Sequence, residues 1–175
     1  MSGPIEIWKQ AADNFSRHHA AVTDEQWNAS TPCNEWTVRE LVDHAVGVQT
    51  MMGGALGSGA GEGSDWETVK AGMAAALDAP DSLEGTIDHP AMGEMPKHQV
   101  LGIAGSDLLL HSWDLARAIS GDETLPAEAV DAVLMGLQRM PAEFTRSPGR
   151  FGDEVEVGED ASAQDRLIAF SGRRP

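Results

Sequence analysis

The feature that most constrains the fold is a long helical pattern between Lys97 and Ser120. Apolar side chains recur along it at the spacing of one helix face, and Gly121 follows as a residue suited to end a helix. The apolar positions are Val100, Ala104, Leu108, Leu115 and Ala118. A helix with one apolar face must bury that face against other elements, so we expect a packed core around this segment.

Other segments repeat the helical pattern, whereas strand signals are few. The segment 37–52 opens with Thr37 and Glu40 in the spacing of a capping box, which satisfies the free amides of a helix start. Pro126 suits the first turn of a further helix. We predict helices over 4–22, 37–52, 65–78, 97–120, 126–140 and 161–171, the last capped by Asp160, with short extended pieces over 86–89 and 154–157 and a flexible glycine-rich connection over 53–64.

This pattern predicts an all-α fold: a four-helix bundle with short extra helices and minor strand. We expect the bundle core to come from 4–22, 37–52, 97–120 and 126–140. The chain of 175 residues contains no internal repeat and no domain-sized linker, and its length suffices to bury a core. The sequence therefore predicts a single helical-bundle domain over 1–175.

The chain is strongly acidic, since 12 Lys+Arg against 28 Asp+Glu give a formal net charge of −16. This charge repels phosphate backbones and anionic bilayers, so neither nucleic acid nor a membrane is an expected partner. The single cysteine, Cys33, excludes an intrachain disulfide and fits a reducing compartment. No apolar run approaches a membrane span and no signal-peptide pattern is present, so we predict a cytoplasmic location.

Two polar residues interrupt the apolar face of the 97–120 helix. Asp107 and His111 are four residues apart, so their side chains project from one face and can converge on one point. A carboxylate at a core-facing position is costly unless it is paired or binds a metal. The spacing leaves two interpretations open: a buried hydrogen bond between the two side chains, or two ligands of a divalent transition metal.

A third candidate ligand lies on the helix predicted over 37–52. His44 is at the edge of the apolar face of that helix, where a lone histidine is usually a boundary residue. If the two helices pack together, His44 can join Asp107 and His111 in a set of two histidines and one carboxylate. Three protein ligands leave a position open for water or substrate, which is typical of a reactive metal rather than a structural one.

Three stretches of the chain resemble the motifs of a known family. They are Thr31-Pro32-Cys33-x-x-Trp36-x-Val38-x-x-Leu41-x-x-His44-x-x-Gly47, the sequence HSWDLARA over 111–118, and the ending LIAFSGRRP over 167–175. Together they resemble the DinB/YfiT-like superfamily, and most closely the metal-binding N-terminal domain of mycothiol-dependent maleylpyruvate isomerases. The resemblance implies a four-helix bundle and a divalent metal, often zinc or nickel, at His44, Asp107 and His111. It also implies mycothiol or a similar low-molecular-weight thiol as a cofactor.

Two departures limit what the resemblance implies. The isomerases carry Glu at the position of Asp107, so the shorter side chain here would hold a metal closer to its helix. They also have a further C-terminal domain that contributes to the substrate site, and this chain is too short to contain a full one. We therefore expect a single metal-binding domain, and we do not expect maleylpyruvate as its substrate.

Residues next to the predicted ligands are candidates for substrate contacts. Trp113 borders the site, although core packing explains it equally well. Asp114 and Arg117 suit a substrate carboxylate or outer contacts of the metal site, but such a pair is more often a helix salt bridge. Cys33 is interpreted as a small buried apolar group rather than a nucleophile. On this interpretation, His111→Ala abolishes tight metal binding, whereas Asp114→Ala leaves the metal content largely intact.

These observations favour a metal-dependent transferase or isomerase that uses a small thiol to act on a small electrophilic substrate. A bound cation would stabilise the thiolate at neutral pH. Two alternatives remain open: a metal-dependent hydrolase, and a non-enzymatic metal-binding or stress-response module in which the metal stabilises the bundle. The expected partners are the thiol, its substrate and a second copy of the chain in a homodimer.

Overall fold

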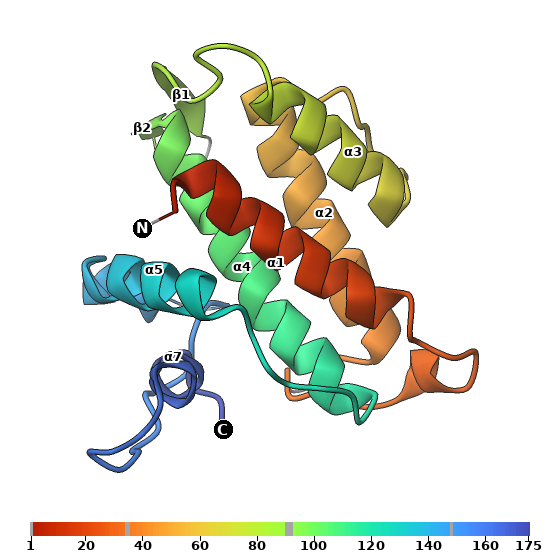
Figure 1. Ribbon diagram of the computed structural model, residues 1–175, viewed down its shortest axis with the longest axis vertical. Coiled ribbons are helices and arrows are strands. Elements are labelled where there is room, and N and C mark those ends of the chain that lie inside the picture. The colour runs from red at the N-terminus through yellow and green to blue at the C-terminus, as the bar shows by residue number, and fades with distance from the viewer. Residues whose placement is uncertain (1, 34–35, 90–92, 148) are drawn as a thin grey trace.

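Four helices that lie side by side form the body of the protein (Figure 1). The structure is a computed structural model that describes residues 2–33, 36–89, 93–147 and 149–175. Helix α4 (Lys97–Ala118) packs against α1 (Pro4–His19) and α2 (Val38–Leu56), while α3 (Trp66–Leu77) packs along α2 and reaches α1. The predicted all-α bundle is confirmed.

The remaining elements are short and lie around this bundle. A 3-10 turn, η1 (Gln26–Asn28), lies between α1 and α2, and an antiparallel pair of strands, β1 (Thr86–His89) and β2 (Gly93–Pro96), precedes α4 with Thr86 opposite Pro96. Helix α5 (Ala127–Gln138) packs on α7 (Ala163–Phe170) and contacts α1 and α4, and the single turn α6 (Ala142–Thr145) lies between α5 and α7 in the chain.

The fourth member of the bundle differs from the prediction. The segment 126–140 was expected in that place, but α5 lies to the side of the bundle with α7, and α3 runs along α2 instead (Figure 1). Helix α3 packs on its neighbour in the chain, α2, whereas α5 contacts α7 more extensively than it contacts either α1 or α4. Helix α3 also presents a fully buried face of Trp66, Val69, Met73 and Leu77.

The end of the chain departs from the prediction in two further places. The alternating residues 154–157 form no strand, because nothing in the described ranges pairs with them as a ladder; the Val155 amide alone donates to the Ala169 carbonyl, at 3.0 Å. The last helix begins later than predicted. Its first amides are satisfied by Ser162 rather than Asp160, since the Ser162 hydroxyl accepts a hydrogen bond from the Asp165 amide.

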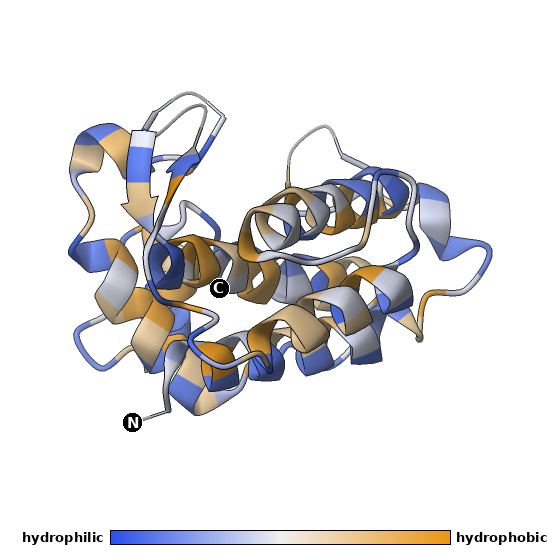
Figure 2. Ribbon diagram, turned by 90° about the horizontal axis from the view of Figure 1, so that it is seen from above, coloured by the Kyte–Doolittle hydropathy of each residue, from blue (hydrophilic) through white to orange (hydrophobic). Residues whose placement is uncertain are grey.

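The glycine-rich connection is shorter than predicted because α2 continues to Leu56. Gly57 then ends the helix in the left-handed conformation, with φ of 96°. The core consists of the inward faces of the helices, and Figure 2 shows hydrophobic and hydrophilic stretches alternating along the helix ribbons, as this arrangement requires. None of the described helices is long and apolar enough to cross a bilayer.

Candidate metal centre

The packing of α2 on α4 brings three titratable side chains together. The start of α2 is fixed by the predicted capping box, in which the Thr37 amide donates to Glu40 Oε2 at 2.8 Å and the Glu40 amide donates to Thr37 Oγ1. Two turns into this helix, His44 faces α4, where Asp107 and His111 lie one turn apart. The site therefore joins two rigid helices and does not depend on a loop.

Asp107 lies between the two histidines. Its Oδ1 atom is 3.3 Å from His44 Nε2 and 3.5 Å from His111 Nε2. The candidate ligand atoms of all three residues lie within 4.8 Å of one another. Such a spacing allows one ion to contact all three at ordinary ligand distances. The structure thus brings the three predicted side chains to one point, and their role as ligands stays a prediction.

The other carboxylate oxygen of Asp107 tests whether the residues fit a cation. Asp107 Oδ2 is buried and has no hydrogen-bond partner among the described residues. A hydrogen bond between Asp107 and a histidine accounts for Oδ1 alone, and an unsatisfied buried carboxylate oxygen is costly. A divalent cation would satisfy Oδ2, and two imidazoles with one carboxylate are suitable ligands for zinc or nickel.

Opposing charges dominate the electrostatics of the cluster. Burial by itself raises the pKa of Asp107, but His111 and His44 outweigh it, so the net shift of this carboxyl pKa is downward. Burial by itself lowers the pKa of His111, but Asp107 and Asp114 outweigh it and raise that pKa well above its ordinary value. Without a metal, the buried carboxylate thus favours a protonated imidazole beside it.

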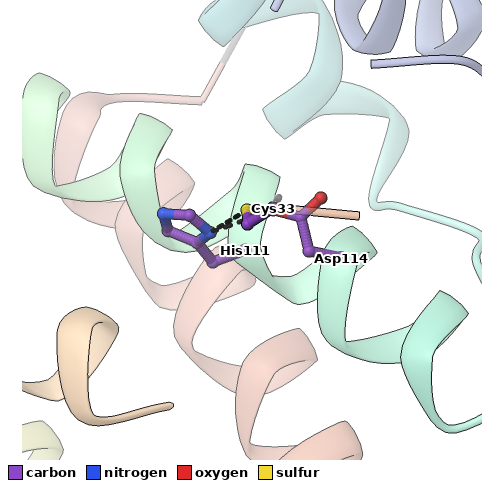
Figure 3. A group of neighbouring side chains, drawn as sticks. All are labelled: Cys33, His111 and Asp114. Atoms are coloured by element: carbon purple, nitrogen blue, oxygen red, sulfur yellow. Dashed lines mark hydrogen bonds and ion pairs between the residues drawn. The ribbon is translucent and has the colours of Figure 1, made fainter. Parts of the chain in front are cut away.

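The second nitrogen of His111 faces a separate set of polar groups. His111 Nδ1 is 2.9 Å from Asp114 Oδ2 and 3.8 Å from Cys33 Sγ. Figure 3 shows the sulfur of Cys33 on this side of the imidazole. Arg173, near the end of the chain, donates from Nε to Asp114 Oδ1 and from Nη2 to Asp114 Oδ2, both at 2.7 Å.

Cys33, His111 and Asp114 also bring candidate ligand atoms within 4.8 Å of one another. This second set differs from the first because a cation of the protein already occupies it. The Arg173 guanidinium contacts both oxygens of Asp114 and lies 3.5 Å from Cys33 Sγ. The first set therefore remains the candidate metal centre.

The structure places the three predicted substrate-contact residues in three different environments. Trp113 is 1% exposed and packs in the core, with the Arg117 guanidinium 4.0 Å from its ring centroid. Arg117 also pairs with Glu123 at 2.6 Å. Asp114 is 0% exposed and bonded to His111. Their contacts with a substrate stay a prediction.

A cavity of about 640 Å³ opens beside the candidate metal centre. His44, Asp107 and His111 contribute to one part of its wall. Trp36 belongs to the same wall, and its ring centroid is 4.6 Å from that of His44. Much of the remaining wall is apolar: Val48, Met51, Met52, Ile103, Leu110, Leu137, Met140, Phe144 and Phe151. Trp113, Asp114 and Arg117 are not among the described residues that line it.

Arg173 is the residue that sequence reasoning missed. It also lines the cavity, and it comes from the same LIAFSGRRP ending that carries part of the family resemblance. An arginine in that motif was the available signal. Nothing in the local spacing, however, indicates its contact with Asp114, which is 59 residues earlier in the chain.

Comparison with known proteins identifies the family of the chain. The profile of the family described as "Mycothiol maleylpyruvate isomerase N-terminal domain" matches residues 8–99, more than half of the chain. The chain belongs to this family. The mycothiol maleylpyruvate isomerase N-terminal domain family is part of the DinB/YfiT-like superfamily, so the predicted resemblance is confirmed. The matched segment contains Cys33, Trp36 and His44 but ends before Asp107 and His111.

Two relatives that match almost the whole chain come from Mycobacterium tuberculosis. They are "Uncharacterized protein MT0763" of strain CDC 1551 / Oshkosh and "Uncharacterized protein Rv0738" of strain ATCC 25618 / H37Rv. Each is 30% identical over 178 residues, which cover 97% of this chain and 97% of the relative. No solved structure matches the chain. The family connects the fold to mycothiol-associated, isomerase-type proteins.

Proposed function

We propose that this protein binds one divalent metal ion, zinc or nickel, through His44, Asp107 and His111, and that it transfers or isomerises a small electrophile with the help of a small thiol. The observation that carries the proposal is the convergence of His44, Asp107 and His111 beside an open cavity, together with a buried Asp107 Oδ2 that has no hydrogen-bond partner among the described residues. When bound, the metal would supply stabilisation of the thiolate at neutral pH. Mycothiol is the thiol that the family suggests.

Two parts of the cavity wall have different proposed roles. The imidazoles and the carboxylate at one part of the wall would hold the metal, and the Trp36 ring packs against His44 at a tilt of 41°, which limits the movement of that side chain. The apolar side chains elsewhere, such as Met51, Met140 and Phe144, exclude water and favour a substrate with an apolar body. Methionines in particular adapt their shape to different ligands.

Neither alternative function gains support from this arrangement. A hydrolase needs a base beside the metal-bound water. Among the described residues that line the cavity, Asp107 is the sole carboxylate, and both histidines of the wall are proposed ligands. A purely structural metal site is closed to solvent. Here the side chains of His44 and Asp107 are 34% and 21% exposed.

Metal analysis of untagged protein tests the binding step. Wild-type protein is expected to bind close to one zinc ion per chain, and His44→Ala and His111→Ala are each expected to lose tight binding because a ligand is gone. His98→Ala is the matched control, because His98 is exposed at the start of α4 and outside the cluster. Equal metal content in the wild type and both ligand variants would refute the assignment.

Thioether formation tests the catalytic step. Mycothiol and a fluorogenic alkyl halide are incubated with metal-loaded wild type, with metal-free wild type and with His111→Ala. The expected reaction joins the thiol sulfur to the alkyl carbon, breaks the carbon–halogen bond, and releases halide and the proton of the thiol to solvent; we expect acceleration only by the metal-loaded wild type. An equal rate in all three samples would contradict the enzymatic proposal while leaving metal binding intact.

A further inference from the structure

His111 stands between two polar environments, and its two ring nitrogens serve different neighbours. Nε2 faces Asp107 at 3.5 Å, while Nδ1 faces Asp114 at 2.9 Å. A neutral imidazole carries one proton, so only one nitrogen can offer a lone pair to a metal. A carboxylate beside Nδ1 keeps the proton there and leaves the lone pair on Nε2, on the side of Asp107 and His44.

Asp114 is itself held in one orientation. Its carboxylate is fully buried and lies three residues after His111 on α4. Arg173 forms a two-pronged (bidentate) ion pair with this carboxylate, with one nitrogen donating to each oxygen, both at 2.7 Å. A planar guanidinium that contacts both oxygens fixes the plane of the carboxylate, which a single point charge does not. Cys33 completes the surroundings with its sulfur 3.1 Å from Asp114 Oδ2.

The segment that carries Arg173 is fixed by backbone contacts. The Arg173 amide donates a hydrogen bond to the Ile168 carbonyl at 3.1 Å, which connects this segment to the end of α7. Just before it, Gly172 has φ of 82° and passes so close to Gly152 that an added Cβ would lie 2.9 Å from the Gly152 Cα. The guanidinium therefore enters the core from a defined backbone position.

We infer that Asp114 and Arg173 are positioning residues of the metal centre: Asp114 fixes the tautomer and orientation of His111, and Arg173 fixes Asp114. The inference rests on the proposed function, since it assigns His111 Nε2 to the metal. It assigns a role to the 172–175 segment in a site whose ligands all lie on α2 and α4. Neither residue touches the metal position, so neither is proposed as a ligand.

Zinc affinity of conservative variants tests this inference. Asp114→Asn keeps the shape of the side chain but removes the negative charge beside His111 Nδ1, so the Asp107 carboxylate near Nε2 competes better for the proton of the imidazole. We expect this variant and Arg173→Gln to bind zinc about 10- to 100-fold more weakly than wild type in competition with a chromophoric chelator. Arg173→Lys, which keeps the charge but not the two-pronged contact, is expected to recover part of the loss.

Two controls and a spectroscopic measurement separate positioning from general destabilisation. Arg17 and Asp122 form an exposed pair at 3.2 Å, so Arg17→Gln and Asp122→Asn remove the same groups away from the site and should keep wild-type zinc affinity. In metal-free protein at a pH where His111 is neutral, ¹⁵N NMR should show the proton on Nδ1 in wild type and a shift of population toward Nε2 in Asp114→Asn.

The outcomes distinguish this inference from the proposed function. If wild type binds no zinc, the proposed function fails, and the tautomer comparison alone decides the positioning role. If wild type binds zinc while folded Asp114→Asn and Arg173→Gln bind it equally well, the positioning role is wrong and the metal centre stands. An unchanged His111 tautomer in Asp114→Asn would overturn the role of Asp114 directly.

Discussion

Two aspartates of α4 lie seven residues apart and have very different partners. Asp114 accepts from Arg173 and His111, whereas one oxygen of Asp107 has no partner among the described residues. Asp114→Ala leaves a guanidinium that cannot lose its proton, so we expect a loss of about 3–5 kcal/mol in the free energy of unfolding. Asp107→Ala leaves histidines that can become neutral, so its loss should be clearly smaller. Urea denaturation of metal-free protein measures both; equal losses would contradict this account.

His18 offers a pH test away from the site. Burial, and then the neighbouring Arg17, lower the pKa of this 3% exposed histidine. The unfolded chain binds the proton at the ordinary pKa of about 6.5, so the native state binds fewer protons and loses stability as pH falls below that value. Wild type should therefore lose more stability between pH 7 and pH 5 than His18→Gln. His111, whose pKa is raised, contributes to the pH dependence of stability with the opposite sign, but it is present in both wild type and His18→Gln and cancels in the comparison. Parallel curves of stability against pH for the two proteins would refute the prediction.

At the residue scale, sequence alone predicted the convergence of Asp107 and His111, because helix geometry fixes side chains four residues apart. It placed His44 at the edge of an apolar helix face, and the family motif added that this residue is a ligand together with the other two. Asp114 was expected to be dispensable for the metal, but its burial and its bond to His111 change that expectation. Arg173 could not be predicted, because its contact depends on how a distant segment folds back onto α4.

At the scale of elements, the contact between Gly172 and Gly152 makes a sharp prediction. Gly172→Ala adds a methyl group in a left-handed conformation and against backbone atoms, so we expect a loss of at least about 1–2 kcal/mol in stability. The change should also displace Arg173 and weaken zinc binding. Gly158→Ala is the matched control, since an added Cβ there meets nothing within 4 Å, and its effect should stay within about 0.5 kcal/mol. Equal effects in urea denaturation would contradict the close approach.

The helices themselves were largely predictable, because apolar periodicity, the capping box and the terminal glycines are local signals. Two errors had tertiary causes. The sequence predicts 126–140 as the fourth bundle helix, but helical periodicity does not show that α5 packs on α7 while α3 packs on α2. The alternation over 154–157 indicated a strand, but a strand also needs a partner, and this segment runs beside a helix.

At the scale of the whole molecule, the core is continuous without any contribution from a metal. Buried apolar side chains of all the long helices form one cluster. We therefore expect protein treated with a chelator to keep its helical circular dichroism and a cooperative unfolding transition. Zinc at about 100 times its dissociation constant should raise the stability of wild type by about 2.7 kcal/mol and leave His111→Ala unchanged. Collapse of the helical signal on chelation would instead favour a structural metal.

Few large apolar side chains are exposed among the described residues of this acidic chain. Among the large hydrophobic side chains of the described residues, Met51, Met135 and Val157 are exposed, at 55%, 38% and 38%. Met51 belongs to the cavity wall, which suits a ligand-facing position. The homodimer expected from the sequence stays a prediction, and light scattering at micromolar concentration measures it.

The distance along the chain between the residues of the site bears on how the protein folds. His44 and Asp107 are 63 residues apart, and Asp114 and Arg173 are 59 apart. Closing such loops is slower than forming helices, whose contacts are local. During refolding, helical signal should thus return before the capacity to bind a metal ion. Metal uptake would then report the last contacts of the chain to form, and a partly folded chain would be helical yet unable to hold the ion.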